Sequence, residues 1–179
     1  MIIILSGATH TGKTVLAQKL LERYSYSVLS QDLLKMGLIR SKNTSLTPED
    51  DREMTPYLWG IVKEIIKTAV ENKQNLIVEG CYVPFDWEKD FEPEYLENIK
   101  CYFLIFTENY IKNHYSDIMA HANDIENRLD DSGLTEELLI RENSYYLEGC
   151  RRNGCRCVIA HKTYNIEEEI INDLSTLRK

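Results

Sequence analysis

The chain has 179 residues, of which 43% are hydrophobic and 28% are charged, and its formal net charge is -8. This size and balance are typical of one globular domain with a sizeable core, and 8 Gly and 4 Pro give no sign of a long disordered linker. The acidic balance argues against a nucleic-acid partner, because nucleic-acid binding depends on a basic surface.

Apolar and amphipathic segments alternate along the chain. The first apolar run, "MIIILSG", predicts a strand that is buried on both faces. Four further strands are predicted, and helical segments alternate with the strands along the chain. The strands cover residues 1–7, 25–30, 74–80, 100–108 and 155–162; helices are expected at 13–24, in the first part of 31–45, and at 47–73, 109–123, 135–153 and 165–179.

Three details of these helices can be predicted. Thr47 is the expected N-cap of the long helical segment, with Pro48 at its first position and acidic residues in its first turn. Pro56 is expected to break or kink that helix. Thr135 is the expected N-cap of the helix over 135–153, and the segment 82–99 is predicted to be a loop with short helices.

Alternation of strands and helices predicts an α/β fold with a five-stranded parallel sheet and helices on both faces. Ligands of such sheets bind beyond the carboxyl ends of the strands. We therefore expect a site among the residues that follow the predicted strands, at 7–14, 31–32, 79–82, 107–109 and 161–163.

The stretch "GATHTGKT" follows the first strand and matches G-x-x-x-x-G-K-[ST] at every fixed position, the P-loop pattern. Its glycines permit backbone angles and close approach that a side chain would block, so that successive N–H groups point at an anion. The lysine can reach the β- and γ-phosphates of ATP, and the final threonine can offer its hydroxyl to Mg²⁺. The predicted nucleotide-binding residues are Gly7, Ala8, Thr9, His10, Thr11, Gly12, Lys13 and Thr14.

Charged residues that follow the second and third strands are candidates for the phosphate acceptor's site. Asp32, in "LSQDLLK", can accept a proton from an acceptor hydroxyl or help to hold the metal, although Asp is also favoured in the first turn of a helix. Arg40 can bind an anionic acceptor or be a solvated surface charge. Glu79 ends the buried strand in "LIVEGCYVP", which favours a role as a metal ligand or a substrate contact.

Two arginines are candidates for neutralising the charge of a transferring phosphoryl group. Arg128 lies in the charged segment "DIENRLDDSG", and Arg141 lies on the helix that follows. The segment 122–135 is predicted to be a short lid that closes over ATP and excludes water. The alternative is a solvated loop, with ion pairs among Arg141, Glu148 and Arg152 on one helical face.

The five cysteines give no sign of a disulfide framework, because their number is odd and their spacing is irregular. The apolar stretch "MIIIL" is too short for a signal peptide or a membrane span. We therefore expect a reduced, cytoplasmic protein with no membrane association. Cys150, Cys155 and Cys157 fall in "CRRNGCRC", which lacks a CxxC pair; a helix end, a turn and a strand start are expected there rather than a zinc site.

These residues together resemble the P-loop small-molecule kinases, the group that includes the nucleoside monophosphate kinases. "GATHTGKT" is similar to their phosphate loop, and "RLDD" followed by Arg141 is similar to the lid of adenylate kinases. That resemblance implies that Arg128 and Arg141 contact the phosphates in the transition state. "NLIVEGCYVP" resembles the corresponding strand of 2-phosphoglycerate and zeta-toxin kinases, in which an acid after the second strand, here Asp32, positions the acceptor hydroxyl.

The leading prediction is one kinase domain over 1–179 that uses ATP and Mg²⁺ to phosphorylate a small molecule, either a nucleotide or a phosphorylated metabolite. Lys13, Asp32, Arg128 and Arg141 would be catalytic, Thr14 and Glu79 would hold the metal, and Asp32, Arg40 and Glu79 would contact the acceptor. The alternative is a nucleotide-binding switch or an ATPase without a small acceptor. A kinase of nucleic-acid ends is less favoured because of the charge.

Overall fold

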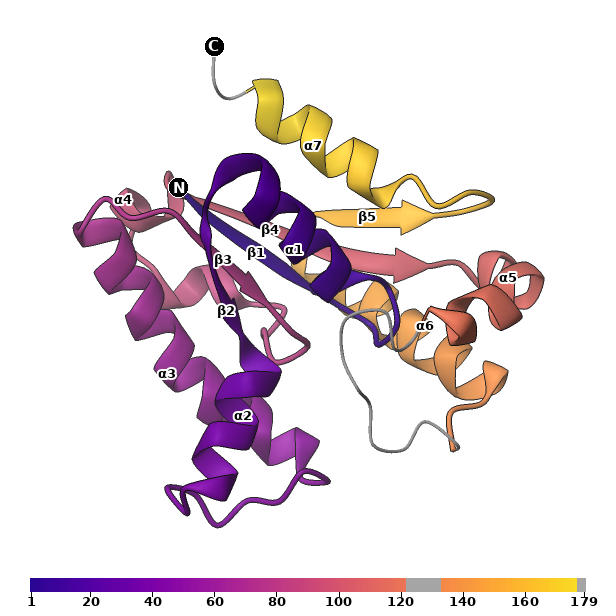
Figure 1. Ribbon diagram of the computed structural model, residues 1–179, viewed down its shortest axis with the longest axis horizontal. Coiled ribbons are helices and arrows are strands. Elements are labelled where there is room, and N and C mark those ends of the chain that lie inside the picture. The colour runs from indigo at the N-terminus through magenta and orange to yellow at the C-terminus, as the bar shows by residue number, and fades with distance from the viewer. Residues whose placement is uncertain (122–132, 177–179) are drawn as a thin grey trace. The chain divides into compact units, whose positions relative to one another are not determined.

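The computed structural model describes residues 1–121 and 133–176. They form two compact units, which are treated separately below. The first unit contains residues 1–6 and 17–101, and the second contains residues 7–16 and 102–179. Figure 1 shows the helices and strands along the chain.

The strands of the first unit pair in parallel around a central strand. β3 (Leu76–Glu79) lies between β1 (Ile2–Gly7, whose last residue belongs to the second unit) and β2 (Ser27–Ser30). Leu5 of β1 and Ser30 of β2 both stand in register with Glu79. All four residues of β3 are buried, as expected for a strand with neighbours on both sides.

The helices of the first unit pack around these strands. α2 (Gln31–Arg40) contacts both β2 and α3 (Asp51–Glu71), and Figure 1 shows α3 as the longest helix. Met54 and Leu58 of α3 form a buried cluster with Tyr82, which lies just beyond β3. The remaining elements are η1 (Trp87–Asp90), α4 (Pro93–Leu96) and the part of α1 (Lys13–Tyr24) from residue 17 onward.

The second unit contains a second parallel strand pair. β4 (Ile99–Phe106, of which residues 102–106 belong to this unit) pairs with β5 (Cys157–Ala160), and Phe106 stands in register with Ala160. Three helices accompany the pair: α5 (Glu108–Ala120), α6 (Glu136–Asn153) and α7 (Ile166–Thr176). α5 packs against α6, and α7 packs against β5 (Figure 1).

The α/β fold class and its five parallel strands are confirmed. The predicted cap of α6 is also confirmed, because the Thr135 side chain accepts a hydrogen bond from the backbone N–H of Leu138 (3.3 Å). Among the described residues, no helix is both long and apolar enough to cross a membrane.

The predicted start of the long helix is wrong, and the helix is not broken at Pro56. α3 begins at Asp51, not after a cap at Thr47, because the Thr47 N–H and hydroxyl both donate to Asp50 Oδ2 (2.7 and 2.8 Å) and close a separate turn. The helix continues through Pro56 without a break, and the kink expected there stays a prediction. Proline at that position removes a single intrahelical hydrogen bond, near the start of the helix, and the buried face of the 21-residue helix holds the rest in place.

Candidate functional site

The phosphate loop, residues 7–14, lies in the second unit, between the end of β1 and the start of α1. Gly7 has φ +124°, and a Cβ there would lie 2.2 Å from the backbone oxygen of Leu104. Only glycine accommodates both the backbone angle and this close approach. The loop backbone is therefore pressed directly against the backbone of β4.

Side chains of the loop bond back to its own backbone. The buried Thr11 hydroxyl donates to the Ala8 carbonyl oxygen (2.8 Å), and Lys13 Nζ donates to the same oxygen (2.7 Å). The Leu16 N–H donates to Gly12 O (2.9 Å), so the first turn of α1 starts within the loop. The half-buried Lys13 thus keeps its amine at the loop, where it is available to a bound phosphate.

Helix α6 also contacts the phosphate loop. Glu142 Oε1 accepts a hydrogen bond from the backbone N–H of Thr9 (3.0 Å), and the neighbouring Asn143 is buried. Asn143 Oδ1 accepts from the Phe106 N–H (2.7 Å), and its amide donates to Leu139 O (2.9 Å). The sequence did not predict a role for Glu142 and Asn143, because no sequence pattern marks them.

A tyrosine from the segment after β5 lies against the same loop. Tyr164 Oη donates to Thr11 O (3.3 Å) and lies 2.5 Å from where a Cβ on Gly12 would stand. Its ring packs edge-on against Phe106, with centroids 6.1 Å apart. Burial raises the pKa of Tyr164 well above the ordinary value, so that its hydroxyl is a neutral donor.

The structure describes only one of the two arginines that are predicted to be catalytic. Arg141 is exposed on α6, directly before Glu142, and so lies on the helix that contacts the phosphate loop. Arg128 and most of the predicted lid lie outside the described residues, which resume at residue 133. Arg152 forms an ion pair with Glu148, as the alternative interpretation of this helical face predicted.

The acceptor candidates belong to the first unit. Asp32 is the second residue of α2, directly beyond β2, and Glu79 is the last residue of β3 with 1% of its surface exposed. The register between Ser30 and Glu79 puts both acids at the carboxyl edge of this strand pair. Arg40 is the exposed last residue of α2.

A buried glutamine fixes this edge. The Gln31 side chain, which is fully buried, accepts from the Tyr82 N–H (2.9 Å) and donates to the Tyr82 carbonyl oxygen (3.3 Å). It therefore ties the first residue of α2 to the turn that follows Glu79. Since Asp32 comes directly after Gln31, the same pair of bonds positions the start of the helix that carries Asp32.

A buried lysine extends the connection from α2 to α3. Lys35 Nζ donates to Tyr82 Oη (2.6 Å), to Pro48 O (2.9 Å) and to Asp51 Oδ1 (3.2 Å), while the Tyr82 hydroxyl donates to Asp51 Oδ1 (2.7 Å). Burial is the main cause that raises the pKa of Tyr82 far above the ordinary value. Gln31, Lys35 and Tyr82 were also missed, because their partners are distant in sequence.

The metal prediction stays a prediction. Thr14 is half-buried in the second unit, and Glu79 is buried in the first. In residues 1–121 and 133–176, no group of three or more His, Cys, Asp and Glu side chains is arranged to hold a metal ion. A P-loop hydroxyl is one ligand among phosphate oxygens and waters, so its chemistry suits Mg²⁺ without such a group.

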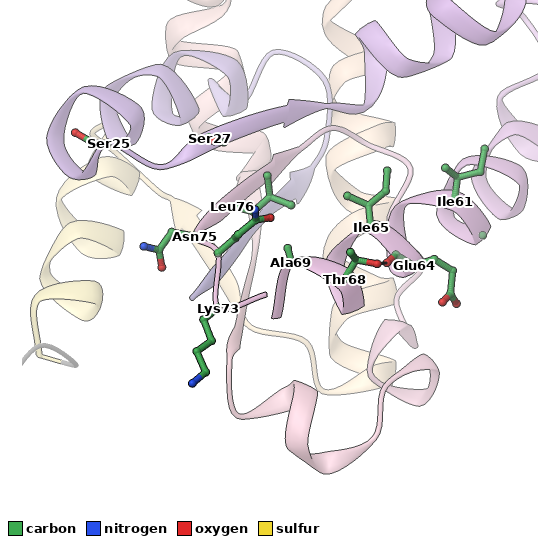
Figure 2. A pocket seen from close by; sticks show the side chains of 12 residues that line it. Ser25, Ser27, Ile61, Glu64, Ile65, Thr68, Ala69, Lys73, Asn75 and Leu76 are labelled. Carbon is green, nitrogen blue, oxygen red and sulfur yellow. Dashed lines mark hydrogen bonds between the residues drawn. The ribbon is translucent and has the colours of Figure 1, made fainter. Parts of the chain in front are cut away.

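A hollow of about 760 Å³ lies elsewhere in the first unit, at the amino ends of its strands. Figure 2 shows lining residues from α3, such as Ile61 and Ile65, and from the starts of β2 and β3, such as Ser27 and Leu76. No predicted site residue lines it. Because ligands of parallel sheets bind at the carboxyl ends of the strands, we do not assign the site to this hollow.

Comparison with known proteins supports the fold. A family profile described as an AAA domain matches residues 2–86, which is less than half of the chain. Deoxyadenosine kinase from M. mycoides, solved with bound dATP, has a TM-score of 0.59 at 15% identity, covering 98% of this chain and 99% of that chain.

Two further solved structures are similar over nearly the whole chain. A sugar kinase from Janibacter sp. has a TM-score of 0.55 at 12% identity, covering 97% of this chain and 94% of that chain. Shikimate kinase from Aquifex aeolicus has a TM-score of 0.50 at 14% identity, covering 99% and 98%. No curated protein matches the sequence. The chain therefore has the fold of these small-molecule kinases, and the predicted resemblance is confirmed for the fold.

Proposed function

We propose that the protein is a kinase that transfers the γ-phosphoryl group of ATP to a hydroxyl of a small molecule. The observation that carries the proposal is the phosphate loop, in which Gly7 presses the backbone against β4 while Lys13 keeps its amine at the loop. The similar solved structures are named as kinases of deoxyadenosine, shikimate and a sugar, which are all small molecules with hydroxyl groups.

The proposed mechanism assigns a role to each predicted residue. Backbone N–H groups of residues 7–14 and Lys13 hold the β- and γ-phosphates, and Thr14 and Glu79 would hold Mg²⁺, which neutralises phosphate charge when bound. Asp32 accepts the proton of the acceptor hydroxyl as its oxygen attacks the γ-phosphorus, and ADP leaves. Arg128 and Arg141 stabilise the negative charge of the transition state. Arg40 binds an anionic group of the acceptor.

One observation favours a second candidate. The family profile that matches residues 2–86 is described as an AAA domain. An ATPase or a nucleotide-dependent switch would hydrolyse ATP at the same phosphate loop, with water in place of the acceptor. The two candidates share the roles of Lys13 and Thr14 and differ in the role of Asp32.

The deciding experiment is a screen for phosphorylated products with ATP, Mg²⁺ and a library of nucleosides, nucleotides, sugars and hydroxy acids. A kinase gives a phosphorylated compound and ADP in equal amounts; an ATPase gives ADP and free phosphate regardless of the library. Lys13→Ala is expected to abolish turnover nearly completely with the circular dichroism spectrum unchanged. Lys89→Ala, which removes an exposed lysine paired with Asp86, is the matched control. Unchanged turnover in Lys13→Ala would refute both candidates.

A further inference from the structure

The first residue of α2 continues the pairing of β2 with β3. β2 ends at Ser30, which stands in register with Glu79, and α2 begins at the next residue, Gln31 (Figure 1). The Gln31 side chain then takes the part of a strand backbone, because its amide accepts from the N–H of Tyr82 (2.9 Å) and donates to the carbonyl oxygen of the same residue (3.3 Å). One more step of pairing is therefore made after the strand has become a helix.

Space for this amide exists because residue 80 is a glycine. Gly80 has φ +150°, and a Cβ there would lie 2.5 Å from Gln31 Oε1 and 2.6 Å from Gln31 Cβ. The Gly80 N–H also donates to Leu5 O of β1 (3.1 Å), which holds Gly80 in this place. Both the backbone angle and the close approach require glycine. The turn after Glu79 is thus shaped to receive the Gln31 side chain.

A buried amide fixes position more strictly than an apolar side chain does. Gln31 is 0% exposed, and burying an amide costs free energy that its hydrogen bonds must offset. These bonds form only while the amide faces the N–H and the carbonyl oxygen of Tyr82 together, so they hold the first turn of α2 against the turn after β3. Asp32 is the next residue of that helical turn, which Ser30 Oγ caps by accepting from the Leu33 N–H (3.5 Å).

We propose that Gln31 is a positioning residue that acts through Asp32, because its amide fixes the place from which the Asp32 carboxylate takes the proton of the attacking hydroxyl. This inference rests on the proposed function, in which Asp32 is the proton acceptor. Catalysis by such a group depends on geometry, and a displacement of about 1 Å can cost about 10²-fold in rate. Gln31 is fully buried, so it affects the reaction through this placement.

Gln31→Met tests the role, because methionine has nearly the same length and makes neither hydrogen bond to Tyr82. The rate of ADP formation from ATP and Mg²⁺ is measured with the compound library described above, in the wild type, in Gln31→Met, in Asp32→Asn and in the double variant. We expect Gln31→Met to lower the rate by about 10- to 100-fold, while the dissociation constant for ADP changes little. In the Asp32→Asn background the same change is expected to have little effect, because no proton acceptor is left to misplace.

Two further variants accompany this cycle. Gln18→Met removes the amide of an exposed glutamine that is paired with Glu22 on α1, and it is the matched control, with an unchanged rate expected. Gln31→Asn keeps an amide that is one CH₂ group shorter, and it is expected to follow Gln31→Met. It provides the same comparison if the methionine variant does not fold, which circular dichroism shows.

The outcomes separate this inference from the proposed function. The inference alone is overturned if Gln31→Met or Gln31→Asn folds and forms ADP at the wild-type rate. It is also overturned if the rate falls by the same factor in both backgrounds, because a purely structural role gives that pattern. If the wild type forms no ADP, or if Asp32→Asn keeps the wild-type rate, the proposed function is refuted and the inference with it.

Discussion

Gly7→Ala tests whether the phosphate loop is pressed against β4. The residue has φ +124°, outside the range of L side chains, and the new methyl group would lie 2.2 Å from Leu104 O and 2.6 Å from Leu104 N. Backbone strain of this kind costs about 1–3 kcal/mol, and forced overpacking costs about 1–3 kcal/mol more. We expect a loss of about 2–6 kcal/mol from a free energy of unfolding of about 5–15 kcal/mol.

Gly154→Ala is the matched control. Gly154 also has positive φ (+70°), but a Cβ there meets no atom within 4 Å. The left-handed conformation of alanine lowers the free energy of unfolding by about 1–2 kcal/mol. The smaller conformational freedom of alanine in the unfolded chain offsets about 0.4–1 kcal/mol of this loss. Guanidinium unfolding of the reduced proteins, followed by circular dichroism, measures both variants. If Gly7→Ala loses no more stability than Gly154→Ala, the close approach of the loop to β4 is wrong.

Two further predictions concern the separate halves of the site. Asp32→Asn is expected to lower the rate of phosphoryl transfer to the acceptor by about 10²–10⁴-fold, which is the usual contribution of a general base. The dissociation constant for ATP, measured by calorimetry, is expected to change little. Equal losses in transfer and in ATP binding would indicate a metal or structural role for Asp32. Glu142→Gln keeps an acceptor for the Thr9 N–H, whereas Glu142→Ala leaves it without this partner. A neutral hydrogen bond contributes about 0.5–1.5 kcal/mol, so we expect the free energy of unfolding of the alanine variant, measured in guanidinium chloride, to be lower than that of the glutamine variant by about this amount, and equal values would contradict this.

The local features of the fold could be predicted from the sequence. β1 and the phosphate loop were recognisable because a buried apolar run, two glycines and a lysine occur at fixed spacing. The Thr135 cap is an equally local signal and is confirmed. The start of α3 was predicted wrongly although its signals are also local. Thr47 can either cap a helix or close a turn with Asp50, and the sequence does not decide between the two. The hydrogen bonds to Asp50 Oδ2 select the turn.

The connections that organise the acceptor edge could not be predicted in this way. The bonds between Gln31 and Tyr82 join residues 51 apart, and those between Lys35 and Tyr82 join residues 47 apart. A glutamine next to Asp32 has the same sequence signature whether it is exposed or buried. Its partner becomes visible only once β2 and β3 are paired, because that pairing sets α2 beside the turn after Glu79.

The division of the chain also gives a physical reason to expect that the two halves respond separately to mutation. The phosphate loop is held by partners within the second unit, Leu104, Glu142 and Tyr164, whereas Asp32 and Glu79 are held within the first by strand register and by Gln31. Variants that share no partners are additive in their free energies as a rule. A double variant of Asp32→Asn and Glu142→Ala should therefore show the transfer defect of the first and the loss of unfolding free energy of the second, each at full size.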